Sequence, residues 1–483
     1  MFGLLKTKDV TKLPPLQLFN SETRELEVFE PLHKRSVKMY SCGPTVYDLA
    51  HIGNLRAYVF ADTLKRVLLL NGYDVNHTVN YTDFGHLTSD GDTGDDKMMK
   101  GLKREGMTVS LENMRTLSDR YITAFEDDIA SLNIIFPTQF SRASDYVTEQ
   151  IKLIETLDEK GYLYETSDGL YFEVAKFPTY GRLGNIDIEA LKDGARVEVN
   201  NEKKHPADFA VWKKGDLGWH SKKYGTGFPG WHIECSAMAF STLGKQIDIH
   251  TGGVDNMPTH HNGEIAQCEA ASGKQFVKYW LHSEHLNIDN AKISKSDGSS
   301  QYLADIQAKG VSGETYRYWL LTSHYRSQVN LTDEALQGAK QALHRLKRYV
   351  YEDWADEKGA LHTTYWSRFV AAVNDDLDTP KAIATLWEMI KDDTVSNGEK
   401  RTTLREADLV LGIGLALDTE EGLRELGHVD VTNIPQNVQE LVDAREAARI
   451  AQNWPEADRL RDAIGLAGYT IEDSQDGPKL TKQ

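Results

Sequence analysis

The sequence is poor in cysteine, in long apolar runs and in positive charge. Three cysteines in 483 residues are too few for a disulfide framework, which fits a reducing cytosol. No apolar stretch reaches the roughly 18 residues that a membrane-spanning helix needs. The first residues lack an apolar core followed by a small-residue cleavage site, so no signal peptide is predicted. We therefore expect a cytosolic protein without a membrane anchor.

The net charge of −18 argues against a protein that binds polyanions over its whole surface. A local basic patch would still suffice for nucleic-acid recognition. Hydrophobic residues make up 40% of the chain, which indicates a globular protein, and the length suggests about two to four domains.

The apolar pattern predicts βα units on both sides of a long insertion. "SVKMYSC" (36–42) and "YDVNHTVNYTD" (73–83) are predicted strands, joined by a helix that Gly72 ends. After residues 95–225 the pattern returns, with predicted strands at 245–253 and 277–289. Units of this kind build parallel sheets, so we expect a doubly wound parallel α/β sheet split by an insertion.

Beyond residue 302 the chain is predicted to be mainly helical. One apolar face follows three- and four-residue spacing and consists of Leu336, Ala339, Leu343, Leu346 and Val350. Residues 415–435 are predicted to form a linker. The tail then starts with the predicted helix "VQELVDAREAARIAQNW", which breaks before Pro455.

Four side chains of metal-binding type stand where they could meet. His260 and Glu264 are four residues apart, so on a helix both reach one point. Cys42 ends a predicted strand, where parallel sheets bind ligands, and Cys235 lies near a helix start, which favours a thiolate. The set suits Zn²⁺. Spacing alone favours a plainer alternative, two buried cysteines and a surface pair, because no close C-x-x-C pair is present.

Three short motifs could handle phosphate. "HIGN" (51–54) opens a helix whose N–H groups and dipole attract phosphate, and His51 could donate to it. "TGGVD" (251–255) ends a strand with two glycines, and Asp255 could accept from ribose hydroxyls. "KISKS" (292–296) carries two lysines that could neutralise a triphosphate. A helix cap, a plain turn and a solvated basic loop are the respective alternatives.

The order of these motifs resembles that of the class I aminoacyl-tRNA synthetases. "MYSCGPTVYDLAHIGN", "NYTD", "PGWHIECSAMA", "TGGVD", "HHNGE" and "KISKS" are similar to the cysteinyl-tRNA synthetase family, as are "AREAARIAQNWPEADRLRD" and "YTIEDSQDGP". The similarity runs from about residue 17 to the tail. It implies a Rossmann-like catalytic sheet split by an insertion, then a helical bundle and a small α/β tail domain.

The implied parts are an N-terminal extension (1–20), the two catalytic halves (21–141 and 226–300), a connective insertion (142–225), a stem-contact region (301–344), the bundle (345–420) and an anticodon-binding tail (432–483). The implied reaction is ATP-dependent formation of cysteinyl-adenylate with release of pyrophosphate, followed by transfer of cysteine to the 3′-terminal ribose of tRNA(Cys). One Zn²⁺ per chain, Mg²⁺ with ATP, and a cytoplasmic, monomeric enzyme are also implied.

The resemblance assigns roles to individual residues. The implied zinc ligands are Cys42, Cys235, His260 and Glu264, and the implied catalytic residues are His51, Lys292 and Lys295. The implied ATP contacts are His51, Asn54, Gly252, Gly253, Asp255 and Lys295, and the implied amino-acid contacts are Gly43, Thr82 and Trp231. For Trp231 a place in the core is the alternative.

The resemblance also gives the metal a purpose. Cysteine and serine differ by one atom, and shape separates such substrates by only about 1–3 kcal/mol. Zinc prefers a thiolate to a hydroxyl, so it could select cysteine by bonding its sulfur. Editing would then be unnecessary.

The chain departs from the family pattern at three places. Asn54 replaces the final histidine of the family motif and carries no charge. "HHNGE" replaces the more acidic "HHENE", although both ligand positions remain. The segment 83–97 is longer than usual, and a solvated acidic loop is favoured over a second metal site made by His86, Asp90, Asp92, Asp95 and Asp96. Cys268 is expected to pack in the core.

Two other functions compete. A cysteine ligase of the mycothiol-ligase kind would use the same adenylate with a small amine acceptor, but such proteins lack a full tRNA-binding tail. A weakly catalytic paralogue that only binds RNA or zinc is the other, and Asn54 is its best support. ATP–pyrophosphate exchange and tRNA charging separate the three.

Overall fold

The computed structural model describes residues 13–84, 97–186, 201–230, 232–289, 291–292, 301–429, 434–474 and 477–482. The chain divides into two compact units. One comprises residues 1–337 and 367–385, and the other comprises residues 338–366 and 386–483. In the part of the chain that the structure describes, no helix has the length and apolar character needed to cross a membrane.

The first unit is built on a five-stranded parallel sheet with the order β11-β10-β3-β4-β5. The strands are β3 (Ser36–Ser41), β4 (Asp74–Tyr81), β5 (Gln139–Arg142), β10 (Ile247–Gly253) and β11 (Val277–Ser283). β4 follows β3 in the sequence and pairs with it on one side, whereas β10, which comes much later in the sequence, pairs with β3 on the other side. The predicted doubly wound parallel sheet is thus confirmed, and its strand order reverses between β3 and β10, the place where such sheets bind ligands.

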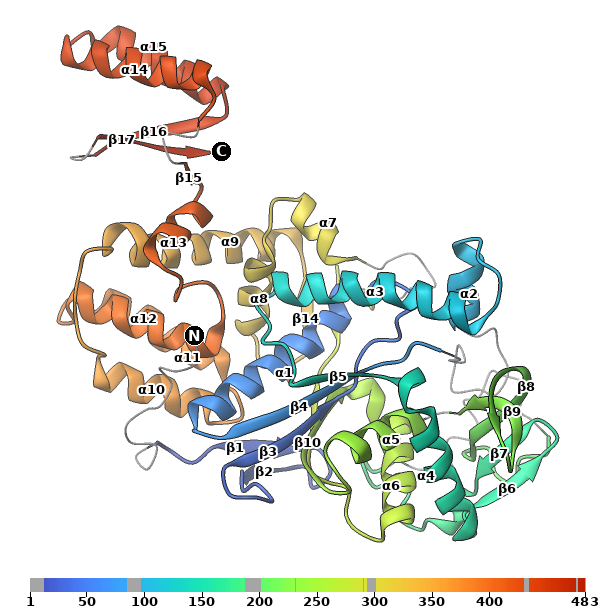
Figure 1. The fold of residues 1–483 in the computed structure, drawn as a ribbon. Coiled ribbons are helices and arrows are strands. Elements are labelled where there is room, and N and C mark those ends of the chain that lie inside the picture. Colours follow the sequence, from blue (N-terminus) through green and yellow to red (C-terminus); the bar gives the residue numbers. More distant parts are fainter. Residues whose placement is uncertain are drawn as a thin grey trace. The chain divides into compact units, whose positions relative to one another are not determined.

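Helices cover both faces of this sheet (Figure 1). α1 (Ile52–Leu70) and α3 (Leu111–Ser131) lie on one face, and α5 (Ile233–Thr242) and α6 (Asn262–Ser272) lie on the other. α1 ends where Gly72 adopts a φ of +78°, a conformation that glycine takes without steric cost. The remaining helix before the insertion is α2 (Lys97–Arg104).

A buried ion cluster fixes α1 in the first unit. The Asp62 carboxylate, fully buried, accepts from Arg66 Nε at 2.7 Å and lies 2.5 Å from Arg317 Nη2. It also accepts from the backbone N–H of Ile135 at 2.8 Å. Because every partner of this carboxylate is itself charged or a backbone donor, the buried charge is compensated. α1 is therefore fastened to α8 (Gly313–Leu321) and to the chain before β5.

The insertion forms a four-stranded antiparallel sheet with the order β6-β7-β8-β9. Its elements are α4 (Val147–Glu159), β6 (Leu163–Thr166), β7 (Gly169–Phe172), β8 (Phe209–Ser221) and β9 (Gly225–Pro229). Buried side chains such as Phe172 and Trp212 share one core with Ala266 and Ala270 of α6. The insertion is therefore packed on the sheet's helical layer rather than tethered loosely to it.

The predicted strand 277–289 is wrong as a single element. β11 ends at Ser283, and β12 (Leu286–Ile288) pairs instead with β13 (Ala291–Lys292) and β14 (Val329–Leu331) in a separate sheet. Two contacts turn the chain between them. Arg56 donates to the carbonyl of His285 at 2.5 Å, and the Glu284 N–H donates to the Tyr325 carbonyl at 2.9 Å. The first unit also contains a hairpin of β1 (Gln17–Asn20) and β2 (Glu25–Val28), and the short helix α7 (Leu303–Ala308).

The helical region contains α9 (Asp333–Arg348), α10 (Thr363–Val373), α11 (Thr379–Lys391) and α12 (Asn397–Leu411). All five residues of the predicted apolar face, Leu336 to Val350, are buried. The predicted linker 415–435 is wrong in part, because it contains α13 (Thr419–Glu425) and β15 (His428–Val429). Asp418 caps α13 by accepting the Glu421 N–H at 2.8 Å, a local start signal that the interpretation as a linker overlooked.

The tail has a core of its own. It consists of α14 (Gln436–Ile450), α15 (Trp454–Leu466), β16 (Tyr469–Ser474) and β17 (Gly477–Lys482), with β15 completing the sheet. The buried residues Val438, Val442, Ile464, Tyr469, Ile471 and Leu480 pack together. The first tail helix ends four residues earlier than predicted, since Gln452 takes a φ of +57° and Trp454 begins α15 with Pro455 in its first turn.

Candidate active site

The point where the strand order reverses holds a cluster of metal-binding side chains. Cys42 follows β3, and its N–H donates to the Thr251 carbonyl of β10 at 3.2 Å. The hydroxyl groups of Ser41 and Thr251 also form a hydrogen bond of 2.6 Å. These bonds hold the end of β3 against β10 and fix the Cys42 side chain at the carboxyl edge of the sheet.

The four predicted zinc ligands come together here. One donor atom from each of Cys42, Cys235, His260 and Glu264 lies within 4.8 Å of the other three. Glu264 Oε1 stands 3.1 Å from His260 Nε2 and 3.8 Å from Cys42 Sγ. Cys235 is the third residue of α5 and 2% exposed, and Glu264 is fully buried. Residues from three distant parts of the sequence therefore converge on one buried point.

A π-helical turn, η7 (Met257–His261), leads into α6 and shapes the cluster. Adjacent side chains on an α-helix diverge by about 100°, but the wider π turn lets both His260 and His261 face the site. His261 Nε2 lies 3.3 Å from Cys42 Sγ. Turns of this kind are frequent at functional sites.

Outer partners orient two of the four ligand side chains. His232 Nδ1 lies 2.9 Å from His260 Nδ1, which leaves His260 Nε2 for the cluster. His250 Nε2 lies 3.0 Å from Glu264 Oε2, which leaves Oε1 for the cluster. Such second partners commonly fix the tautomer and the orientation of metal ligands. A Cβ atom at Gly263 would lie 2.2 Å from the His232 ring, so glycine in "HHNGE" makes room for this partner.

Four histidines at or around the cluster were missed by sequence reasoning, namely His232, His250, His261 and His282. His250 and His261 form a second set with Cys42 and Glu264, again within 4.8 Å. His261 Nδ1 lies 2.8 Å from His282 Nε2, and His282 Nδ1 lies 2.8 Å from Ser21 Oγ. The available signal was a lone histidine near the end of each of two apolar strands, β10 and β11. The two sets share Cys42 and Glu264, so they overlap at one site.

The charge states of the cluster suit a cation. A hydrogen bond with Cys42 lowers the pKa of Cys235 to about 6, and the same bond raises the pKa of Cys42. Burial alone would raise the pKa of Glu264, but His250 and His260 lower it to about 2. A thiolate and a carboxylate are thus available beside a second thiol and His260. Burial alone would lower the pKa of His260, but Cys235 and Glu264 raise it, so a metal ion bound here would have to displace the His260 proton. Two sulfurs, one nitrogen and one oxygen fit Zn²⁺.

The motif "HIGN" stands at the start of α1 as predicted. His51 caps the helix and accepts the Asn54 N–H on Nδ1 at 3.1 Å. The Ile52 N–H donates to the Gln301 carbonyl at 2.9 Å, and His51 pairs with Tyr302. The chain that follows "KISKS" is thereby fixed against "HIGN".

The other end of "KISKS" is also placed. The backbone of Lys292 belongs to β13, which pairs with β12. Lys295 lies outside the described residues, so its role stays a prediction. Both flanks of the motif are nevertheless anchored to the first unit.

The first glycine of "TGGVD" is required by its surroundings, whereas the neighbour of the second is the end of an exposed side chain that can move. A Cβ atom at Gly252 would lie 2.7 Å from His261 Cε1, and one at Gly253 would lie 2.3 Å from Asp255 Oδ1. Asp255 itself is exposed in the turn after β10. ATP binding by these residues stays a prediction.

Two of the predicted amino-acid contacts adjoin the cluster. Gly43 follows Cys42, and its N–H donates to Asn80 Oδ1 at 2.8 Å. Asn80 Nδ2 in turn donates to Thr82 Oγ1 at 3.3 Å, so one amide orients both positions. A Cβ atom at Gly43 would lie 1.5 Å from the Asn80 carbonyl oxygen, which only glycine permits. Trp231, the third predicted contact, lies outside the described residues.

The remaining expectations concern the segment 83–97 and Cys268. Asp83 is buried and accepts from the Ser144 N–H at 2.9 Å and from its hydroxyl at 2.6 Å. The predicted acidic loop beyond it, with His86, Asp90, Asp92, Asp95 and Asp96, lies outside the described residues. Cys268 is fully buried, as expected for a core residue.

Family models match two parts of the chain. Residues 28–341 match the model described as the class I (C) tRNA synthetase catalytic domain, and residues 432–478 match the cysteinyl-tRNA ligase anticodon binding domain. Together they span the cluster, "HIGN", "KISKS" and the separate tail.

Curated relatives match over nearly the whole length. Cysteine–tRNA ligase 1 of Burkholderia lata is 44% identical, with 96% of this chain and 97% of the relative covered. Cysteine–tRNA ligase of Treponema denticola is 40% identical, with 95% and 98% covered.

A solved structure shares the fold at low identity. Methionyl-tRNA synthetase of Mycobacterium tuberculosis bound by methionyl-adenylate matches with a TM-score of 0.57 and 14% identity, over 82% of this chain and 94% of that one. With the parallel sheet, the two matched domains and the full-length relatives in agreement, the chain belongs to the cysteinyl-tRNA synthetase family of class I aminoacyl-tRNA synthetases.

Proposed function

We propose that this chain activates cysteine with ATP to form cysteinyl-adenylate and pyrophosphate, and then transfers cysteine to the 3′-terminal ribose of tRNA(Cys). We further propose that a bound zinc ion selects cysteine over serine. The observation that carries this proposal is the convergence of two thiols, an imidazole and a carboxylate where the sheet reverses its strand order. That is the edge at which sheets of this type bind nucleotides.

Cys42, Cys235, His260 and Glu264 would hold the ion. When bound, zinc supplies a preference for a sulfur ligand over a hydroxyl. His232 and His250 keep two of its ligands turned toward the cluster. Gly43 and Thr82 adjoin Cys42 at the ends of neighbouring strands, where they would orient the amino and carboxylate groups of the substrate.

Activation would rest on positioning and on charge compensation, without a covalent enzyme intermediate. The start of α1, with His51 and Asn54, would bind the phosphates, and Lys292 and Lys295 would compensate charge as pyrophosphate leaves. Gly252, Gly253 and Asp255 would meet the nucleoside. Mg²⁺ would accompany ATP, and a cytosolic monomer remains the expectation from the sequence.

The rival functions are less well supported. A ligase that acts on a small amine would have no use for the tail, which matches an anticodon-binding model and carries its own core. A paralogue that only binds RNA or zinc would have no use for His51, Lys292 and Lys295, all of which the chain retains. Cysteine-dependent exchange together with charging of tRNA(Cys) supports the proposed function, and the absence of both would contradict it.

The metal itself can be counted. Protein purified without added metal is expected to contain about one zinc per chain, since four donor atoms of suitable type lie within 4.8 Å of one another. Elemental analysis gives the content, and removal with a chelator should abolish cysteine-dependent exchange until zinc is returned. Fully active protein with less than about a tenth of an equivalent of zinc would contradict the zinc assignment.

Loss of the tail is expected to separate the two half-reactions. A chain ending after Glu425 should keep cysteine-dependent exchange, because the removed tail core contains no residue of the candidate site. It should charge tRNA poorly, by roughly a hundredfold or more, since phosphate and base contacts dominate such affinities. Charging as efficient as that of the full chain would give the tail another role.

The arginines of the tail differ in how far their side chains are exposed for contact with RNA. Arg445 is buried and pairs with Asp473 at 2.8 Å, and Arg449 pairs with the same carboxylate at 2.5 Å. The tail offers four arginines to tRNA, Arg445, Arg449, Arg459 and Arg461. Of these, Arg445 is buried and paired, so its role is structural. Arg459 and Arg461 are exposed and remain available for RNA.

A further inference from the structure

We propose that Asn262 and Arg182 form a latch that fastens the insertion onto the ligand-bearing helix α6, and that this latch positions the cysteine site. The fastened segment is Thr179–Ile186, the part of the insertion that approaches α6 before residue 187. The inference rests on the proposed function of the ligand cluster. It assigns positioning roles to two side chains that contact neither the cluster's donor atoms nor "HIGN".

Asn262 uses both ends of its amide. It is fully buried, and its Nδ2 donates to the Leu183 carbonyl at 3.0 Å and to the Met257 carbonyl at 2.7 Å. Its Oδ1 accepts the Leu183 N–H at 3.3 Å. Only an amide side chain can donate and accept in this way, because an ionised carboxylate has no donor. This is one of the two positions at which "HHNGE" departs from the family pattern "HHENE", and it is the one where an acidic residue is replaced.

The bond to Met257 is the one that concerns the ligands. Met257 is the first residue of η7, and Asn262 is the first of α6, so the bond spans the π turn that carries His260. The Asn262 amide therefore connects the π turn to the insertion through Leu183, and it also bonds the two ends of the turn through Met257. A shift of Met257 relative to Asn262 would move His260 with respect to Glu264.

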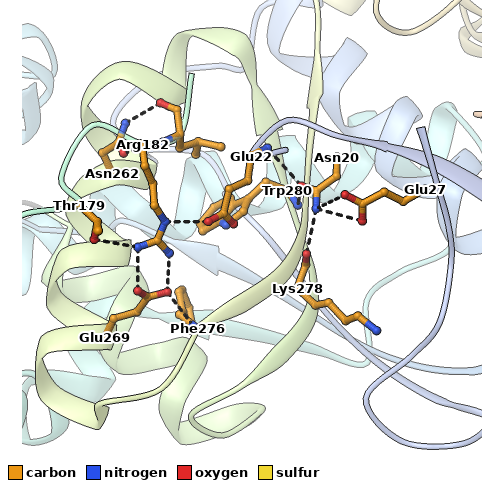
Figure 2. Close-up of polar contacts among 11 residues, drawn as sticks. Asn20, Glu22, Glu27, Thr179, Arg182, Asn262, Glu269, Phe276, Lys278 and Trp280 are labelled. Atoms are coloured by element: carbon orange, nitrogen blue, oxygen red, sulfur yellow. Dashed lines mark hydrogen bonds and ion pairs between the residues drawn. The ribbon is translucent and has the colours of Figure 1, made fainter. Parts of the chain in front are cut away.

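Arg182 makes the second attachment (Figure 2). Its guanidinium forms a bidentate pair with Glu269 of α6 at 2.8 and 2.6 Å, and its Nε donates to Glu22 at 2.7 Å. It also donates to Thr179 Oγ1 at 3.2 Å. Bidentate pairs of this kind fix geometry as well as adding energy. Glu269 is about two helical turns beyond Asn262, so both attachments lie along one face of α6.

The fastened segment is itself tightly turned. Gly181, Gly184 and Asn185 have φ values of +84°, +79° and +53°, and the Ile186 N–H donates to the Gly181 carbonyl at 2.8 Å. Leu183, between the two attachments, is fully buried. The segment therefore acts on α6 as a compact brace rather than as an extended strand.

This arrangement predicts a larger effect on cysteine than on ATP. The latch acts on η7 and α6, on one face of the sheet, whereas His51 and Asn54 start α1, which lies on the other face (Figure 1). α1 has its own attachments in the Asp62 cluster. Of the expected ATP contacts, only those of the turn at Gly252–Asp255 adjoin η7. Loosening the latch should thus raise the KM for cysteine more than the KM for ATP.

The experiment measures ATP–pyrophosphate exchange with four variants of the full chain. Asn262→Leu keeps the approximate volume and removes every hydrogen bond, and Arg182→Met removes both ion pairs. Arg182→Lys keeps the positive charge but cannot form the bidentate pair with Glu269. Arg115→Met is the matched control, since it breaks a pair with Asp145 of 2.8 Å on the first unit away from α6.

We expect Asn262→Leu to raise the KM for cysteine about 10–100-fold, the range typical of lost outer-shell support, and to raise the KM for ATP by a clearly smaller factor. Arg182→Met should raise the cysteine KM less, Arg182→Lys should recover part of that loss, and Arg115→Met should change neither KM. The double variant Asn262→Leu with Arg182→Met should show less than the product of the two effects, because both residues hold one segment.

Equal effects on both KM values, or an unchanged cysteine KM in the Arg182 variants, would overturn the latch. If Asn262→Leu fails to fold, Arg182→Met and Arg182→Lys decide alone, because Arg182 is partly exposed. Failure of the proposed function shows separately, in the unmodified chain, as missing zinc or missing cysteine-dependent exchange.

Discussion

Replacing Cys235 with serine is expected to remove most of the zinc and to lower cysteine-dependent exchange by more than the roughly 10–100-fold that loss of an outer-shell partner costs. The side chain is 2% exposed and one of two sulfurs in the cluster. A serine hydroxyl has nearly the same volume but stays protonated, so it is a poor zinc ligand. ATP binding should survive, since its expected contacts lie at "HIGN", "TGGVD" and "KISKS". Zinc content and exchange, measured together, test this.

A second cysteine provides the control. Cys268 is fully buried on α6 but belongs to neither group of metal-binding side chains found in the described residues. Cys268→Ser should therefore keep its zinc and its preference for cysteine, with only the modest cost of burying a hydroxyl.

The same measurement tests substrate selection. The unmodified enzyme should show exchange with cysteine and almost none with serine at matched concentrations, because ligand preference rather than size discriminates between them. A Cys235→Ser protein that kept its zinc and still strongly preferred cysteine would show that discrimination lies elsewhere in the pocket.

Replacing Lys295 with alanine is expected to slow exchange by about 10²–10³-fold, the typical cost of losing one positioned charge contact in a transition state. The thermal unfolding midpoint should not change, because the flanks of "KISKS" are held by backbone pairing, through β13 on one side and Gln301 on the other. Exchange kinetics and thermal unfolding check the two parts of the prediction.

The matched control is Lys274, an exposed lysine in the turn after α6. Lys274→Ala removes the same charge from the same unit and should leave exchange unchanged. If Lys295→Ala exchanged as fast as the unmodified chain, charge compensation would have to come from another residue.

The sequence was most informative where function constrains local spacing. His260 and Glu264 could be paired from a separation of four residues, and Cys42 could be placed from the end of a predicted strand. The strand order that brings Cys42 beside Thr251 was within reach because βα units have few allowed arrangements. The four ligands could not be joined from spacing alone, and the family resemblance supplied that step.

The parts that escaped sequence analysis depend on contacts between distant segments. His232 supports His260 only because Gly263 leaves space for its ring. The break between β11 and β12 depends on Arg56, more than 200 residues earlier in the chain. No local pattern contains such information, since periodicity reports which face is apolar and not which segment covers it.

The π turn before α6 has a consequence for how this sequence can vary. Removing a single residue between Met257 and Thr259 would allow a regular α-helix, and each residue of an α-helix turns by about 100°. The deletion would rotate Asp255 and the Gly252–Gly253 edge relative to Glu264, although no ligand residue would have been lost. The five residues of η7 thus set the orientation of the expected nucleotide-binding turn relative to the metal-binding helix. A frame-preserving deletion there should be far more damaging than many substitutions at the same positions.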